Sequence, residues 1–339
     1  MENRKQKKLP KILLRIGSIL FLFIAVLLLG VRFYFRFPVS SYYKTSEKAF
    51  LIPGLKDGFI AQGLAYEDGK YYVTGYMKDG SASPIYIVEE STGDCIQTVY
   101  QYTKDLQPYA GHCGGIEVNG KYIYVASGKG LCIYDRSTVE TVSDHSNVPY
   151  IGTFSTMGEN EDYVGVAWLT KHDNELVVGE FYREANYPTP ENHKLTTPAG
   201  DRNQALALIY ELSEDEDSLY GIKPVPKAAY SLPDQVQGVA FSDGKLYCST
   251  SYATPFSHIL EYDLGNSGAD TIPFMNQDLS VSYMDSSNLL RDIKFPPMSE
   301  EIVFVNDRLV TMCESASNKY IFGKFTSAKW CYATDLTAN

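Results

Sequence analysis

The chain is poor in the residues that build common metal and redox sites. Its 339 residues include five histidines, and its six cysteines lie far apart with no C-x-x-C pair. A histidine-rich metal centre, a zinc ribbon and a dithiol redox motif are therefore unsupported. The sequence also lacks a phosphate-binding loop, a G-x-S-x-G elbow and an H-E-x-x-H motif, which are signatures of nucleotide-binding proteins, α/β-hydrolases and zinc proteases.

Positive charge is scarce beyond residue 36. Residues 1–36 carry eight Lys or Arg and one Glu, whereas the remaining 303 residues carry 22 Lys or Arg against 40 Asp or Glu. This larger part has a net charge of −18, which argues against nucleic acid or an anionic membrane surface as its partner. The acidity is compatible with cation binding and equally with simple solubility.

An uncharged apolar run spans residues 16–31 and follows a basic stretch at residues 1–15. Sixteen helical residues give about 24 Å, so neighbouring apolar residues must help to cross a hydrocarbon core of about 30 Å. We predict a cytoplasmic tail at 1–15, a cell-membrane anchor with its aromatic interface at 16–36, and an extracytoplasmic domain. A cleaved signal peptide is the alternative, but no small-x-small site follows the run.

A pattern of paired β-rich segments recurs five times after residue 58. Each copy has a short apolar stretch, a turn, a second β-rich run, a loop and a third run. Turns that contain DG, NG or ND between alternating segments signal β-hairpins, and the abundance of tyrosine, at 27 residues, favours strands. The paired segments begin near Gly63, Gly115, Gly165, Gly238 and Glu301.

This repeat predicts an all-β fold, a β-propeller of five blades over residues 55–339. Six blades are the alternative, because the long fourth unit (237–299) has room for another. The ring must close, since an open sheet edge invites aggregation. Residues 37–54 are a linker or a closing strand, and the last blade is completed by a strand near 49–55 or by the terminal KWCYATDL. The fifth copy places its third run at KYIFGKF (319–325).

The repeats resemble the NHL, gluconolactonase and glutaminyl-cyclotransferase-like propellers over most of residues 55–325. The first copy, FIAQGLAYEDGKYYVTGY, is similar to the opening blade of the glutaminyl cyclotransferases. The resemblance implies a catalytic Glu on the second strand, where this chain has Val73-Thr74-Gly75. A neutral Thr cannot act as general acid or base at neutral pH, so this departure argues against cyclotransferase activity and leaves the resemblance of the fold intact.

Equivalent positions in the blades of a propeller converge on the mouth of its central channel. We therefore predict a binding site from strand starts and from the ends of second strands, comprising Gln62, His112, Glu180, Tyr182, Gln237, Glu300 and Glu314. Glu180 and Glu314 hold like positions and could share a divalent cation such as Ca²⁺ or an amine; solvated loop acids are the alternative. The insertion at 182–204 should project over the mouth, where Tyr187 and His193 could cap a ligand, unless it is a plain surface loop.

These features predict a membrane-anchored, non-catalytic propeller that binds a small molecule, a glycan or a protein partner at its mouth. No cofactor is required by the sequence, and Ca²⁺ is the one candidate. The alternative is a propeller enzyme of lactonase, lyase or cyclotransferase type with or without a metal. A structural role in an envelope complex is a third hypothesis, because propellers host unrelated functions.

Overall fold

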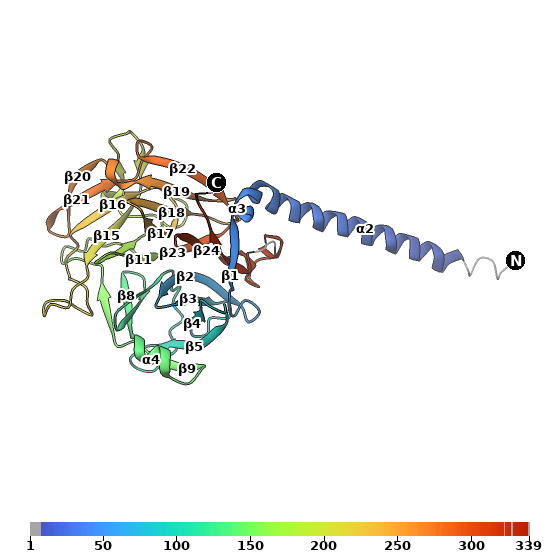
Figure 1. Cartoon of the computed structure of the whole chain (residues 1–339), viewed down its shortest axis with the longest axis horizontal. Coiled ribbons are helices and arrows are strands. Elements are labelled where there is room, and N and C mark those ends of the chain that lie inside the picture. The colour runs from blue at the N-terminus through green and yellow to red at the C-terminus, as the bar shows by residue number, and fades with distance from the viewer. Residues whose placement is uncertain (1–7, 322, 327, 338–339) are drawn as a thin grey trace.

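A ring of five sheets surrounds a central axis, and a long helix extends outward from it (Figure 1). The computed structural model describes residues 8–321, 323–326 and 328–337. The predicted all-β propeller is confirmed in its five-blade form. The innermost strands β2, β11, β17 and β23 lie near the middle of the ring in Figure 1.

The first three blades follow one another along the chain. Blade 1 consists of β2 (Phe59–Glu67), β3 (Lys70–Met77), β4 (Pro84–Glu89) and β5 (Cys95–Tyr102). Blade 2 consists of β6 (Ile116–Asn119), β7 (Tyr122–Ala126), β8 (Gly130–Asp135) and β10 (Gly152–Ser155). Blade 3 consists of β11 (Trp168–His172), β12 (Glu175–Gly179), β15 (Ala205–Glu211) and β16 (Ala228–Leu232). Between blades 1 and 2, β9 (Ser146–Pro149) pairs in parallel with β5.

The last two blades contain the insertion and the closure. Blade 4 consists of β17 (Val236–Ser242), β18 (Lys245–Thr250), β19 (Ser257–Asp263) and β22 (Leu289–Phe295). Blade 5 consists of β23 (Ser299–Val305), β24 (Arg308–Cys313), β25 (Trp330–Thr334) and β1 (Ser46–Leu51). The hairpin of β20 (Ala269–Phe274) and β21 (Gln277–Tyr283) joins blade 3 through parallel pairing of β21 with β16. The long fourth unit therefore widens an existing sheet and forms no sixth blade.

The two segments that were alternatives for closing the ring, one near the start of the propeller and one at its end, both form strands of blade 5. β1 pairs antiparallel with β25, from Ser46 opposite Thr334 to Leu51 opposite Trp330. The prediction of a third strand at 319–325 is wrong, because β25 occupies the position between β24 and β1. The described residues of that segment form a loop with η5 (Gly323–Phe325), and Phe322 lies outside the described residues.

The predicted hairpin turns adopt the left-handed backbone that tight two-residue loops need. In blade 1, Asp68 has φ of 49° and Gly69 has φ of 75°. Blade 4 repeats this with Asp243 at 51° and Gly244 at 70°. Because Asn, Asp and Gly tolerate positive φ, the turn chemistry read from the sequence sets the register of these hairpins.

The hydrophobic core lies between neighbouring blades rather than in one central mass. Each of five clusters joins two adjacent sheets, and the ring is closed by the cluster in which Val73 of blade 1 and Val310 of blade 5 are buried together. The opposite side of blade 1 packs Ile85 and Ile87 with Ile123 of blade 2. Each sheet is thus buried on both faces, which accounts for strands with continuous apolar stretches.

The helix α2 (Lys8–Arg36) is long and apolar enough to cross a membrane, and the chain from Lys11 to Lys44 has a mean hydropathy of 2.8 in its best window. None of that window is buried against the propeller. η1 (Phe37–Val39) and α3 (Ser40–Lys44) link α2 to β1, and the ring of Tyr42 packs 4.2 Å from that of Phe295.

The other short helices lie in connections: α4 (Arg136–Thr141), η2 (Glu191–His193), η3 (Leu264–Asn266) and η4 (Glu314–Ala316).

Candidate functional site

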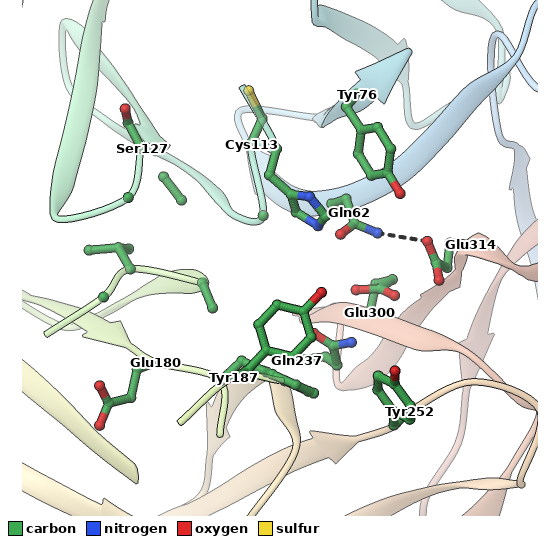
Figure 2. A pocket seen from close by; sticks show the side chains of 18 of the residues that line it. Gln62, Tyr76, Cys113, Ser127, Glu180, Tyr187, Gln237, Tyr252, Glu300 and Glu314 are labelled. Atoms are coloured by element: carbon green, nitrogen blue, oxygen red, sulfur yellow. Dashed lines mark hydrogen bonds between the residues drawn. The ribbon is translucent and has the colours of Figure 1, made fainter. Parts of the chain in front are cut away.

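A cavity of about 740 Å³ opens at the centre of one face of the ring (Figure 2). Six of the seven predicted site residues line it, namely Gln62, His112, Glu180, Gln237, Glu300 and Glu314. Tyr182 does not: its side chain is buried in the core between blades 3 and 4. The chain alternates sides at this point, so that Phe181 faces the cavity and Tyr182 faces inward.

Three bulges aim polar side chains into the cavity. The register of β2 against β3 shifts between Ala61 and Gly63, which isolates Gln62. The equivalent shifts in blades 4 and 5 isolate Gln237 and the pair Glu300-Glu301. A bulge inserts an unpaired residue and redirects its side chain, which explains how strand-interior residues reach the mouth.

The glycine after two of these bulges is required by close packing at the axis. A Cβ at Gly63 would lie 2.9 Å from the carbonyl carbon of Gly115, and a Cβ at Gly238 would lie 2.6 Å from the Cα of Glu301. The recurring Gln-Gly pair therefore has two roles. Its Gln faces the cavity, and its Gly lets the innermost strands touch.

The floor of the cavity on the side of blade 5 is acidic. Glu314 accepts a hydrogen bond from Gln62 Nε2 at 3.1 Å (Figure 2). It accepts another from the Tyr320 hydroxyl at 2.7 Å. Glu300 lies beside this group and is 2% exposed. Burial and the nearby charge of Glu314 raise the pKa of Glu300 well above its ordinary value. Burial likewise raises the pKa of Glu314, which Tyr320 and Lys319 oppose.

Aromatic rings and cations form the walls above this floor. Tyr76 and His112 stack with ring centroids 4.6 Å apart, and Lys319 Nζ lies 4.9 Å from the Tyr76 ring and donates to its hydroxyl. Burial and the charge of Lys319 lower the pKa of His112, which favours the neutral imidazole. On the opposite side, the Arg183 guanidinium lies 4.0 Å from the centroid of the Tyr252 ring. These rings are thus already in cation–π contacts.

Glu180 lines the cavity, but the structure does not bring it to Glu314. Its carboxylate points away from the Glu300 and Glu314 group in Figure 2. Glu180 Oε1 lies 2.7 Å from His193 Nδ1 and accepts a hydrogen bond from the backbone N–H of Leu206 at 2.9 Å. Burial raises the pKa of Glu180, and His193 opposes that shift. The two residues therefore fasten the insertion to blade 3, and the fully buried His193 is not positioned as a cap.

The insertion nevertheless reaches the mouth through Tyr187. The ring of Tyr187 is half exposed, lines the cavity and packs edge-on against Phe181 at 5.3 Å. The backbone N–H of Arg183 donates to Tyr187 O, and that of Tyr187 donates to Arg183 O, which makes a short bridged turn. A small hairpin of β13 (Leu195–Thr196) and β14 (Arg202–Asn203) lies further along.

Glu301 occupies the axis itself. Its Oε2 accepts hydrogen bonds from the backbone N–H groups of Leu64 at 2.5 Å and Ile116 at 3.2 Å, and its Oε1 accepts one from Leu169 at 3.1 Å. One side chain from blade 5 thereby joins the innermost strands of blades 1, 2 and 3. Burial raises the pKa of Glu301, and the three N–H donors oppose the shift.

Several residues at the mouth were not predicted as site residues. Lys319 and Tyr320 fall in the segment expected to be a strand, and their sequence carries no local sign of a loop.

Thr74, at the position of the expected cyclotransferase Glu, is buried and donates to Pro84 O at 2.8 Å. It is absent from the residues that line the cavity.

The described residues contain no group of three or more His, Cys, Asp or Glu side chains that could hold a metal ion. Ca²⁺ binding at Glu180 and Glu314 stays a prediction, although the structure does not bring these two carboxylates together. All six cysteines lie in the described part of the chain as free thiols, and five of them are buried.

No family model and no curated protein matches the chain. Solved structures that resemble it include one titled as a nidogen/laminin complex, at 9% identity and TM-score 0.38, covering 76% of this chain and 73% of that one. BamB from Moraxella catarrhalis is 8% identical with TM-score 0.31, over 79% of this chain and 96% of that one. The tail fibre of Staphylococcus aureus phage P68 is 11% identical with TM-score 0.41, covering 86% of this chain and 53% of that one. Likenesses this distant carry no argument about function, and the propeller assignment rests on the strand order.

Proposed function

We propose that this protein is a membrane-anchored binding protein whose propeller mouth takes a small organic cation. The observation that carries the proposal is the pair of buried carboxylates, Glu300 and Glu314, at the floor of an aromatic-walled cavity of about 740 Å³. A concavity of this size suits a small molecule. A protein partner or a glycan is the less favoured occupant, because a flat protein surface cannot enter the cavity and a neutral glycan cannot offset the charge of the two carboxylates.

The charges at the floor favour a cationic ligand over a neutral one. With both carboxylates ionised, Glu300, Glu314 and Lys319 together carry one net negative charge. Two carboxylates that lie close together repel each other, and a cation removes that repulsion. The face of an aromatic ring attracts an ammonium group by cation–π interaction, worth about 0.5–2 kcal/mol, and the rings of Tyr187 and Phe181 line the cavity. The charge of the floor and the aromatic lining thus support the same ligand class.

A matched pair of ligands tests the proposal. Choline and its neutral tert-butyl analogue have nearly the same shape and differ in charge. We expect choline to raise the melting temperature of the full-length protein in nanodiscs by preferential binding to the folded state, and the neutral analogue to have no effect.

Variants then locate the site. Glu300→Gln with Glu314→Gln should abolish the rise, whereas Glu191→Gln, an exposed charge change on the insertion, should leave it unchanged. Equal shifts from choline and the neutral analogue, or a double variant that responds like the wild type, would refute a cation site at the mouth.

The topology proposed with this function places residues 1–15 in the cytoplasm and the propeller outside the cell membrane. The basic flank before the apolar part of α2 supports this orientation. Protease added to intact cells should release a fragment that begins between the end of α2 and β1. Protection of the propeller in intact cells, with cleavage after lysis, would reverse the orientation.

An enzyme is the second candidate, and the pKa shifts of Glu300 and Glu314 favour it specifically. Two interacting carboxylates with raised pKa values can act as general acid and general base. The resemblance of the repeats to gluconolactonase-like propellers suggests lactones or similar esters as substrates. Hydrolysis of a lactone panel with a bell-shaped pH profile, lost in Glu300→Gln, would establish this function instead.

A further inference from the structure

A second cavity of about 260 Å³ adjoins the mouth and has a different character. It shares the lining residues Met298, Lys319 and Tyr320 with the first cavity, so the two lie side by side against these residues. Its outer walls are largely apolar and include Pro297, Ile321 and Phe35. An acidic and aromatic chamber thus adjoins an apolar one.

The apolar chamber lies where the membrane helix meets the propeller. Phe35, the second-last residue of α2, forms part of its wall and is 8% exposed. The rings of Tyr34 and Phe35 lie 6.0 Å and 6.4 Å from Phe256 of the β18–β19 loop. Aromatic residues at the end of a membrane helix mark the headgroup level of the bilayer. The wall of the chamber formed by Phe35 would therefore lie close to the headgroup level of a bilayer.

An exposed apolar side chain forms part of this chamber, since Ile321 lines it and is 80% exposed. Phe37, directly after α2, is a further exposed apolar residue at 63%. Exposed apolar side chains cost little on a surface that rests on a bilayer. A ligand held in the chamber would therefore have its apolar part close to the bilayer.

We propose that the ligand of the mouth is a single-chain amphiphile with a cationic head, and that its alkyl chain lies in the chamber walled by Phe35. This inference rests on the cation site proposed above and adds the second half of the ligand. The head lies at Glu300 and Glu314, and the chain passes Met298 towards α2. The membrane helix then contributes a wall of the site as well as an anchor.

The alkyl chain makes a quantitative prediction about affinity. Burying one methylene contributes about 0.8 kcal/mol, which is roughly a fourfold gain in affinity. Tetramethylammonium, butyltrimethylammonium and octyltrimethylammonium share one head and differ in chain length. We expect their dissociation constants for the full-length protein in nanodiscs, measured by calorimetry with empty nanodiscs subtracted, to fall steeply along this series.

A variant that fills the chamber separates this effect from partition into the bilayer. Thr254 lines the chamber and is exposed, so Thr254→Trp should fill the space without disturbing the fold. Thr271→Trp is the matched control, because Thr271 is an exposed residue of β20 and lines neither cavity. Each variant should have the melting temperature of the wild type in the absence of ligand, which would show that the substitution leaves the fold intact.

The expected result is that Thr254→Trp binds tetramethylammonium like the wild type but loses at least tenfold in affinity for the octyl compound. Thr271→Trp should match the wild type throughout. If tetramethylammonium binds and Thr254→Trp keeps the full gain with chain length, the chamber does not hold the chain and this inference is overturned, while the cation site stands. If no member of the series binds, the cation site and the inference both fail.

Discussion

Glu300 and Glu301 are neighbours in β23, both are buried, and their surroundings differ completely. The two oxygens of Glu301 accept hydrogen bonds from three backbone N–H groups of three other blades. Glu300 faces the cavity beside a second carboxylate, Glu314. One bulge supplies both side chains, so a single irregularity in the strand provides a structural residue and a candidate binding residue.

The comparison shows that burial of a charged group does not by itself mark function. The pKa values of both Glu300 and Glu301 are raised, and burial is the first cause in each case. Their partners distinguish them, because backbone donors stabilise a carboxylate permanently, whereas a second carboxylate destabilises it until a proton or a cation intervenes. We therefore assign Glu301 to stability and Glu300 to binding, and these assignments can be tested separately.

The largest expected effect comes from removing Glu301. Glu301→Ala leaves the N–H groups of Leu64, Ile116 and Leu169 buried without an acceptor, and each such group costs about 1–3 kcal/mol. The free energy of unfolding should fall by about 3 kcal/mol or more, as measured by urea denaturation in detergent. Glu300→Ala, one position away, is the control and should cost much less. Equal losses in the two variants would remove the distinction between the neighbours.

The sequence predicted those parts of the fold that repeat. The five strand pairs, the hairpin turns such as Asp68-Gly69 and the convergence of Gln62, Gln237 and Glu300 follow from local patterns and ring symmetry. The symmetry of the ring brings equivalent positions of the blades together whatever side chains they contact. It therefore places side chains at the mouth but does not say what their partners are.

The parts that could not be predicted depend on contacts between distant residues. Glu180 and Glu314 hold like positions, yet only Glu180 meets a histidine, because the insertion returns His193 to it. Tyr320 reaches Glu314 because β25, and not residues 319–325, is the third strand of blade 5. The role of Glu301 rests on backbone N–H groups, which have no sequence signature at all.

The pH dependence of stability should expose the repulsion between Glu300 and Glu314. A carboxyl whose pKa is raised by folding binds more protons in the folded state, so stability is full below the unfolded pKa and is lost as pH rises through the folded pKa. Glu300→Gln removes this loss. The variant should gain stability relative to the wild type as pH increases above about 4.5, by up to about 1.4 kcal/mol per pH unit. Parallel unfolding profiles of the two proteins from pH 5 to pH 8 would contradict the repulsion.

Glu117 provides an intermediate case: it lines neither cavity, it has two backbone donors, and the Glu67 carboxylate is only a minor neighbour. It accepts from the N–H groups of Val118 at 2.8 Å and Lys171 at 2.7 Å, and burial raises its pKa to about 7. The raised pKa means that stability falls with rising pH between the unfolded value near 4.5 and about 7. Glu117→Gln should remove the fall in the free energy of unfolding between about pH 4.5 and pH 7 and have no further effect above that range, as measured by denaturation at several pH values. A difference from the wild type that keeps growing above pH 8 would refute the assignment to Glu117.

The smallest effect concerns Lys319, a cation beside the acidic pair. Lys319 Nζ donates to the Tyr76 hydroxyl, and its charge opposes the rise in the pKa of Glu314. Lys319→Met removes this competing charge from the binding site, so choline should bind about fivefold more tightly, equivalent to ~1 kcal/mol. Lys324→Met is the control, because Lys324 is an exposed cation nearby that lines neither cavity. Weaker choline binding in Lys319→Met would mean that Lys319 positions the Tyr76 wall and that its contact with that ring outweighs its repulsion of the ligand.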